Sequence, residues 1–410
     1  MLLRKLFGIV VIVAIAIGCY QWLEQNTDMD LKQQVTTTIQ ETVDDTALFI
    51  KDGLKVESSS SSSRTGEEKL SSKDSEQIVQ YIAKELAEGR TAIDITIQGN
   101  GDDIQNQFAN WLQQAIDVDD YIKYTMESYS YSMNSGLSKS EVALTIVYRE
   151  SHEMSAEVTS YVKQVIKTLE LERYSSFEQV KLIHDWIVQH VQYDQSLTRY
   201  TAYEAITEGT TVCQGYALLG YRFYSEAGFD VRIVEGSVNT GEHAWNLVKI
   251  EGQWYQIDLT WDDPIGQAED DVSYKYYLVS DTQLAQDHVW KADYPVATMS
   301  YQQLLNEQLA TADPASEAFI TIQQSREQLG YHMEDSSNTI ESYEQMKAMV
   351  KSAVGAGETE LQFRYTGGEQ LVDDINKAFK SLNKSLSYQT SYQEWNKAGD
   401  YLVTITIEYR

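Results

Sequence analysis

The chain has 410 residues, enough for roughly two or three domains that each bury a hydrophobic core of their own. Its hydrophobic fraction of 42% is typical of folded domains rather than of disordered chains. A formal net charge of -30 disfavours nucleic acid as a partner, because affinity for the phosphate backbone comes from clustered Lys and Arg.

The first residues have the pattern of an export signal. Two basic residues precede an uncharged apolar run over residues 6–20, which is short for a membrane span of ~20 residues. The basic side of the run predicts that the rest of the chain lies outside the cytoplasm. Cys19 follows an Ala-Ile-Gly segment that resembles the processing site of a bacterial lipoprotein. We therefore expect residues 1–23 to tether the chain to the cell membrane, as an uncleaved signal anchor or through lipid on Cys19.

Residues 24–75 separate this leader from the rest of the chain. Apolar residues recur at helical spacing from Asp28 to Val56, which favours a stalk helix. A serine tract with almost no apolar residues follows and predicts a flexible linker. Such a spacer would hold the domains that follow away from the membrane.

Two segments share one order of predicted elements. Residues 76–150 contain a helix, a strand, a helix and two strands, each with the apolar spacing of its type. Residues 316–410 contain the same order, beginning with a helix near residue 341, and both segments end on Thr-Ile-x-Tyr-Arg. Chance likeness between amphipathic segments is the alternative, and the shared order of elements argues against it. We predict two copies of one small α+β module, whose role their residues do not indicate.

The segment between the modules, residues 155–300, holds most of the residues that can carry chemistry. Its last two predicted strands are joined by a turn at Glu251-Gly252, which indicates a hairpin. The predicted elements are helices at 157–171, 177–193 and 213–227, and strands at 230–238, 243–250 and 253–261.

Cys213 is the candidate nucleophile. It begins a predicted helix, where unpaired backbone N–H groups and the helix dipole favour a thiolate. The same N–H groups could stabilise a tetrahedral oxyanion. An inert buried cysteine is the alternative. A disulfide with Cys19, the other cysteine, is not expected, because that residue lies in the leader.

His243 and Asp258 supply the partners that such a nucleophile needs. The predicted hairpin places them nearly opposite each other on neighbouring strands. A carboxylate there can hold one imidazole nitrogen and turn the other toward Cys213. A nucleophile, a base and an orienting carboxylate are the groups required for thiol-dependent acyl transfer.

The residues around this predicted triad resemble the transglutaminase-like superfamily. The motifs VCQGYA, HAWN and DLTWDDP look like those of bacterial transglutaminase-like domains related to cytokinesis-associated members, and the resemblance covers roughly residues 175–295. It implies Cys213 as nucleophile, His243 as base and acid, and Asp258 as orienter. It also implies a papain-like core, so the expected fold class is α+β: helices packed on an antiparallel sheet, flanked by two small repeated α+β modules.

Several other residues have weaker predictions. The candidates for an oxyanion partner or a cleft wall are Gln214, Tyr203, Trp245 and Trp261, with core packing expected of the tryptophans. The histidines expected to be packing, structural or surface residues are His184, His190 and His288. Animal transglutaminases use calcium, so an acidic loop at 262–271 is a conceivable cation site, but it lacks a spaced ligand loop. No metal and no cofactor is therefore predicted.

Two reactions are open to this triad. In a transglutaminase, a glutamine carboxamide acylates Cys213 and a lysine amine accepts the acyl group; in a protease or amidase, water accepts it. The expected target is a protein or peptide of the cell surface or wall. A non-catalytic surface binding protein is the third interpretation, and the intact Cys, His and Asp argue against it.

Overall fold

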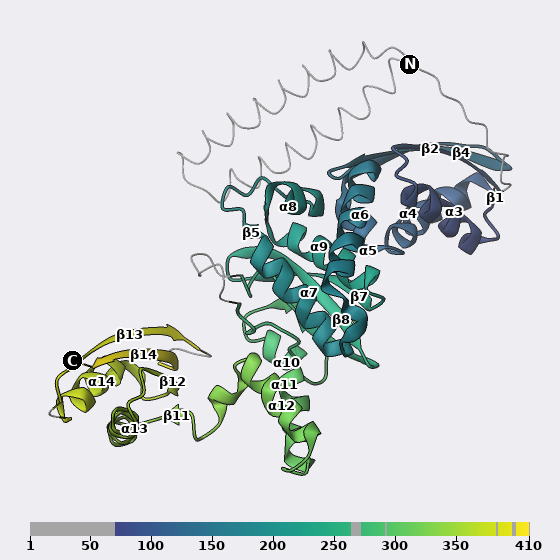
Figure 1. The fold of residues 1–410 in the computed structure, drawn as a ribbon. Coiled ribbons are helices and arrows are strands. Elements are labelled where there is room, and N and C mark those ends of the chain that lie inside the picture. Colours follow the sequence, from purple (N-terminus) through teal and green to yellow (C-terminus); the bar gives the residue numbers. More distant parts are fainter. Residues whose placement is uncertain (1–69, 264–271, 292, 383, 396–398, 410) are drawn as a thin grey trace, which may run out of the picture. The chain divides into compact units, whose positions relative to one another are not determined.

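The computed structural model describes residues 70–263, 272–291, 293–382, 384–395 and 399–409 (Figure 1). The predicted leader with Cys19, the stalk helix and residues 57–69 of the serine tract lie outside the described residues. Leu70 and Ser71, which were predicted to belong to the flexible linker, instead form a short strand in which Leu70 is buried. Helices and mainly antiparallel sheets together confirm the α+β fold class. Within the described ranges, no helix has both the length and the apolar character needed to cross a membrane.

The first module is a four-stranded sheet with its own core. The strands follow the order β1-β2-β4-β3, with a parallel pair β1–β2 and antiparallel pairs elsewhere. Every second residue of β4 is buried, as the alternating pattern predicts, and the buried faces of α3 and α4 join the same core. Its elements are β1 (Leu70–Ser71), α3 (Ser75–Ala87), β2 (Ala92–Gln98), α4 (Gly101–Ile116), α5 (Asp120–Thr125), β3 (Met126–Ser135) and β4 (Lys139–Tyr148).

The C-terminal module has the same topology. Its strands follow the order β11-β12-β14-β13, again with one parallel pair and two antiparallel pairs. The short first strand of each module, β1 and β11, is missing from the predicted order of elements. That the modules are a true repeat stays a prediction. The elements are β11 (Thr339–Ile340), α13 (Tyr343–Ala356), β12 (Glu360–Tyr365), η4 (Gly368–Gln370), α14 (Leu371–Lys380), β13 (Leu386–Glu394) and β14 (Tyr401–Tyr409).

The C-terminal module begins later than the predicted boundary at residue 316. Leu329 and Tyr331 belong to the core of the central domain, whereas the core of the module starts at Ile340. The helices α11 (Tyr301–Thr311) and α12 (Glu317–Gln328), with the 3-10 helix η3 (Tyr331–Glu334), therefore extend the central domain. The boundary was wrong because helical periodicity shows which face is buried and not which core buries it.

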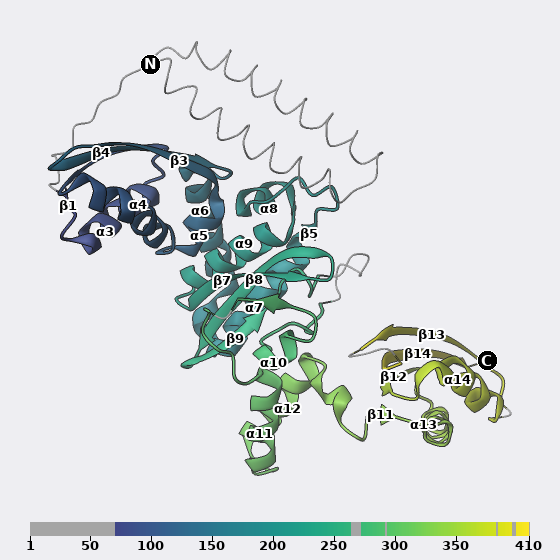
Figure 2. The same cartoon turned by 180° about the vertical axis from the view of Figure 1, so that it is seen from behind.

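The central domain packs helices against one antiparallel sheet of order β10-β7-β8-β9. Its elements are α6 (His152–Leu169), η2 (Leu171–Arg173), α7 (Ser176–His190), β5 (Gln192–Tyr193), α8 (Ala202–Glu208), β6 (Thr210–Thr211), α9 (Cys213–Glu226), β7 (Asp230–Val238), β8 (Gly241–Ile250), β9 (Gln253–Ile257), α10 (Asp281–Leu284) and β10 (Val289–Trp290). Helix α9 contacts β7 and β8. Helix α7 lies in front of the sheet in Figure 1 and behind it in Figure 2, so the helices cover one face of the sheet.

The predicted hairpin between β8 and β9 is confirmed. Glu251 and Gly252 have φ angles of 51° and 86°, the left-handed conformation that a two-residue hairpin turn requires. The turn pairs Ile250 with Gln253, and the pairing continues to the end of β9. Asp258 therefore follows directly after β9, at the end of the sheet where β8 carries His243.

Candidate active site

Cys213 is the first residue of α9, at a helix end that no side chain caps. Val212 occupies the N-cap position and cannot accept a hydrogen bond through its side chain. The backbone N–H groups of Cys213 and Gln214 have no acceptor among the residues that the structure describes. Gly215 allows the close approach of the preceding strand, because a Cβ there would lie 1.8 Å from Thr211 Oγ1. The thiol thus faces two free donors at the positive end of a helix.

His243 lies between Cys213 and Asp258. Its Nε2 atom is 2.7 Å from Oδ2 of Asp258, and the Cys213 thiol lies close enough to the ring to raise its pKa. Burial by itself lowers the pKa of this imidazole, but the charge and hydrogen bond of Asp258, with the thiol, raise the pKa of His243 to about 10. The arrangement therefore favours an imidazolium beside the sulfur atom.

Asp258 is a fully buried carboxylate whose oxygens are all engaged. Its Oδ1 atom accepts from the backbone N–H groups of Thr260 and Trp261 at 3.0 and 3.2 Å. Burial raises the pKa of Asp258, but the charge and hydrogen bond of His243, helped by His288, outweigh it and hold the pKa at about 2. The carboxylate stays ionised and fixes the Nε2 side of the His243 ring.

His288 has a partner that the sequence interpretation missed. Its Nε2 atom lies 3.0 Å from Oδ2 of Asp258, and its Nδ1 atom lies 2.6 Å from Oδ1 of Asp287. The burial of His288 agrees with the structural role expected of it, but its contact with Asp258 was not predicted. Its place in the segment 287–290, 30 residues after Asp258, was the available signal, because the bond to Asp258 depends on the pairing of β10 with β7.

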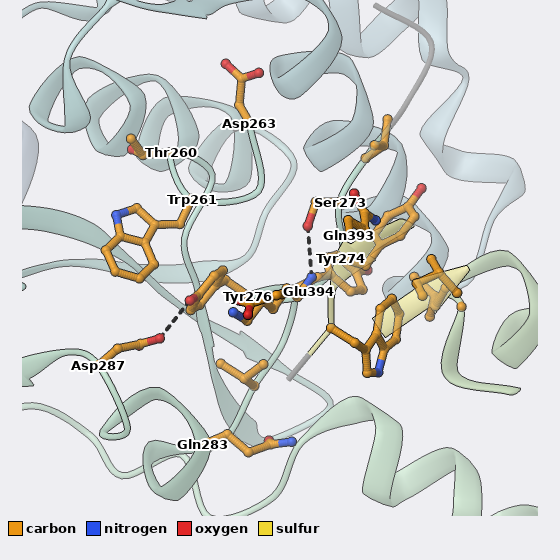
Figure 3. A pocket seen from close by; sticks show the side chains of 18 of the residues that line it. Thr260, Trp261, Asp263, Ser273, Tyr274, Tyr276, Gln283, Asp287, Gln393 and Glu394 are labelled. Carbon is orange, nitrogen blue, oxygen red and sulfur yellow. Dashed lines mark hydrogen bonds between the residues drawn. The ribbon is translucent and has the colours of Figure 1, made fainter. Parts of the chain in front are cut away.

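A cleft opens above these residues. Trp261 lies against Tyr276 on one wall, with ring centroids 5.1 Å apart, and the Tyr276 hydroxyl donates to Asp287 at 2.7 Å (Figure 3). Central-domain residues in the lining include Tyr193, Tyr200, Cys213, Glu242, His243, Trp261, Asp263, Tyr274, Lys275, Tyr276 and Asp287. Trp261 is thus a wall residue, as one prediction had it.

The other three candidates for the oxyanion or the cleft wall do not line the cleft. The side-chain amide of Gln214 donates to the backbone carbonyl of Tyr124 at 2.7 Å, so it is engaged with the first module. Trp245 is 1% exposed and donates to Gln256, which places it in the core. Tyr203 is half-buried and packs against the main core. Trp245 thus has the core packing that was expected of it. The cleft roles suggested for Gln214 and Tyr203 were wrong, because position along the chain does not show the direction of a side chain.

A second polar network supports the segment after β9. Buried His184 of α7 lies 3.1 Å from both Asp185 and Asp262, and Asp262 also accepts from the backbone N–H of Tyr276 at 2.9 Å. Burial raises the pKa of Asp262. Asp262 is thus a structural anchor rather than part of a solvated acidic loop, and residues 264–271 of that loop lie outside the described residues.

One group of described residues has the donor types of a metal site. Possible ligand atoms of His243, Asp258 and His288 all lie within 4.8 Å of one another. These atoms already satisfy one another, because Oδ2 of Asp258 accepts from both imidazoles at hydrogen-bond distances of 2.7 and 3.0 Å. The cluster is accounted for as a hydrogen-bond network.

Comparisons with known proteins agree with the motifs. Residues 161–259 match the family model described as transglutaminase-like superfamily. Kyphoscoliosis peptidase of Mus musculus is 30% identical over 122 residues, and that of Homo sapiens is 29% identical over 120 residues. Each match covers 25% of this chain and 18% of the relative, so the chain spans less than a fifth of the length of these relatives.

Two solved structures are also similar to parts of the chain. A structure titled as a TGase has a TM-score of 0.27 and 12% identity, covering 55% of this chain and 67% of its own. A candidate cysteine protease from Cytophaga hutchinsonii has a TM-score of 0.23 and 16% identity, covering 33% of this chain and 65% of its own. These scores are low, and neither likeness supports a further conclusion.

Proposed function

Because the chain carries a transglutaminase-like superfamily domain at residues 161–259, we propose that it is an acyl-transfer enzyme that works through a thioester on Cys213. The observation that carries the proposal is the position of His243, which lies 2.7 Å from Asp258 and near enough to Cys213 for the thiol to raise the pKa of the ring. Cys213 and His243 both line the cleft, so a substrate can reach them.

The first half of the reaction forms the thioester. The Cys213 sulfur attacks the side-chain carbonyl of a glutamine, and the free N–H groups of Cys213 and Gln214 stabilise the oxyanion. His243 then gives its proton to the leaving nitrogen. The C–N bond breaks and ammonia departs while the C–S bond remains.

The second half transfers the acyl group to an amine or to water. The acceptor attacks the thioester carbonyl and gives its proton to His243. The new bond to the acceptor forms, the C–S bond breaks, and the thiolate is restored beside the imidazolium. Asp258 keeps the ring oriented through both halves without being protonated itself.

A lysine amine is the acceptor that the cleft favours. Among the cleft residues of the central domain, Glu242, Asp263 and Asp287 are acidic, and Lys275 is the basic residue among them. Such a wall attracts a cationic amine. Hydrolysis by water, as in a protease or amidase, is the second candidate, and the names of the two peptidase relatives favour it.

The proposed place of action is outside the cytoplasm. The charge and apolar pattern of residues 1–23 supports a membrane tether, by a signal anchor or by lipid on Cys19. The proposed substrate is accordingly a protein or peptide at the cell surface or in the wall.

The test uses the full-length chain in detergent with a glutamine-bearing protein and a fluorescent primary amine. Fluorescence that becomes covalently bound to the substrate supports transfer to an amine. Deamidation or a cut peptide bond without labelling supports the hydrolase. A Cys213→Ala protein is the control, and the same activity in that variant would rule out the thioester mechanism.

A further inference from the structure

The predicted triad continues beyond Asp258 through a second histidine. Strand β10 pairs with β7, and β7 pairs with β8, where Gly236 lies opposite His243. A Cβ at Gly236 would lie 2.3 Å from the Val289 carbonyl oxygen, so β10 comes this close only because Gly236 has no side chain. His288, directly before β10, is thereby brought to 5.5 Å from His243 between ring centroids.

Asp258 is shared between the two histidines. Its Oδ2 atom is 2.7 Å from Nε2 of His243 and 3.0 Å from Nε2 of His288. The bonds continue from His288 to Asp287 at 2.6 Å and from Asp287 to the Tyr276 hydroxyl at 2.7 Å. His288 is 1% exposed and its ring nitrogens face carboxylates on both sides, so the ring cannot turn without losing a buried hydrogen bond.

We propose that His288 is a positioning residue for acyl transfer: it holds the Asp258 carboxylate in place and takes up part of its hydrogen bonding and charge. The inference rests on the proposed function, since it concerns the base of that reaction. A carboxylate that accepts from two imidazoles binds each of them less strongly than one that serves a single ring. His243 therefore releases its proton more readily when His288 is present.

The proton balance of the cycle explains why this sharing matters. His243 must give a proton to the leaving nitrogen and then take one from the acceptor, so a base that holds its proton too tightly blocks the second half. The titratable groups that face the two rings are Cys213 at the start of α9, Asp258 after β9, and Asp287 and Tyr276 before β10.

The experiment compares His288→Phe, which fills the space without a donor, with His288→Gln, which keeps an N–H donor. His190→Phe is the matched control, because His190 is an exposed residue of α7 that lies outside the cleft. Two readouts are used on the full-length chain in detergent: the pH profile of kcat, and NMR titration of ¹⁵N-labelled histidine. The His243 signal is assigned with a His243→Ala protein.

In His288→Phe we expect the His243 titration and the acid limb of the kcat profile to move to higher pH by about one unit. That shift lowers kcat about tenfold at neutral pH, with KM little changed. His288→Gln should restore most of both. The inference is overturned if the His243 titration is unshifted in folded His288→Phe. It is also overturned if kcat falls without a shift of the acid limb and His288→Gln does not restore kcat. The NMR titration of His243 tests the inference even if the protein transfers no acyl group. A wild-type protein without Cys213-dependent turnover contradicts only the proposed function.

Discussion

Replacing Asp258 by Asn is the most direct test of the hydrogen bonds around His243. The Asn oxygen can take the place of only one carboxylate oxygen. If it accepts from the N–H groups of Thr260 and Trp261, its NH₂ group faces the Nε2 atoms of both His243 and His288. His243 must then accept at Nε2 and carry its proton on Nδ1, the ring nitrogen that Asp258 does not contact. The ring is left in the wrong tautomer to take a proton from the thiol.

The expected loss in kcat is about 10³- to 10⁴-fold, by comparison with the same exchange in other nucleophile–His–Asp triads. This corresponds to ~4–5 kcal/mol of transition-state stabilisation, at ~1.36 kcal/mol per tenfold. Folding should be weakened less, by about 1–3 kcal/mol, because one buried hydrogen-bond partner becomes unsuitable while the shape is kept.

The assay measures kcat and KM for amine incorporation beside the melting temperature. Asp230→Asn is the matched control, because Asp230 is an exposed residue of β7 whose bond to Lys249 lies at the protein surface. A folded Asp258→Asn protein whose kcat lies within tenfold of wild type would show that Asp258 does not set the tautomer of His243.

Three further outcomes are expected. Gly236→Ala places a methyl group 2.3 Å from the Val289 carbonyl, so it should displace β10, lower the melting temperature by several degrees and reduce kcat at least tenfold. Gln214→Ala removes the bond to the Tyr124 carbonyl, so it should lower thermal stability and change kcat only a few-fold. Folding raises the pKa of His243 to about 10 from an unfolded value of ~6.5, so the stability from this protonation is fully present below about pH 6.5 and is lost as the pH rises through about 10. The unfolding free energy, followed by tryptophan fluorescence in urea, should therefore fall across this window in wild type and fall less in a His243→Gln protein.

Each of these outcomes has a control or a contrary result. Gly228→Ala is the control for Gly236→Ala, because Gly228 also tightens a turn, with φ at 91°, but has nothing within 4 Å of the added Cβ. It should cost stability and leave kcat unchanged. A 10²- to 10³-fold loss of kcat in Gln214→Ala would instead make the amide an oxyanion donor. Parallel stability curves for wild type and His243→Gln would contradict the raised pKa of His243.

Local sequence pattern was enough for features that depend on neighbouring residues along the chain. The Glu251-Gly252 turn was predicted because a two-residue hairpin needs positive φ, and the structure has it there. Cys213 was predicted to begin a helix, and it does. The apolar-rich run over residues 230–238 predicted a strand, and β7 spans Asp230–Val238. The tether and the location stay predictions, because the residues that suggest them lie outside the described part of the chain. The natural substrate also stays a prediction, because it was inferred from that location.

Tertiary structure decided everything that depends on which surfaces meet. The pairing of β10 with β7 brings His288 to Asp258, 30 residues earlier in the chain, and two residues of strand are too few to show a periodic pattern. Gln214 directly follows Cys213, yet its amide points to the first module. Spacing along a helix or strand tells which side is buried, since it follows from local geometry, whereas the partner on that side is chosen by packing between segments that are distant in sequence.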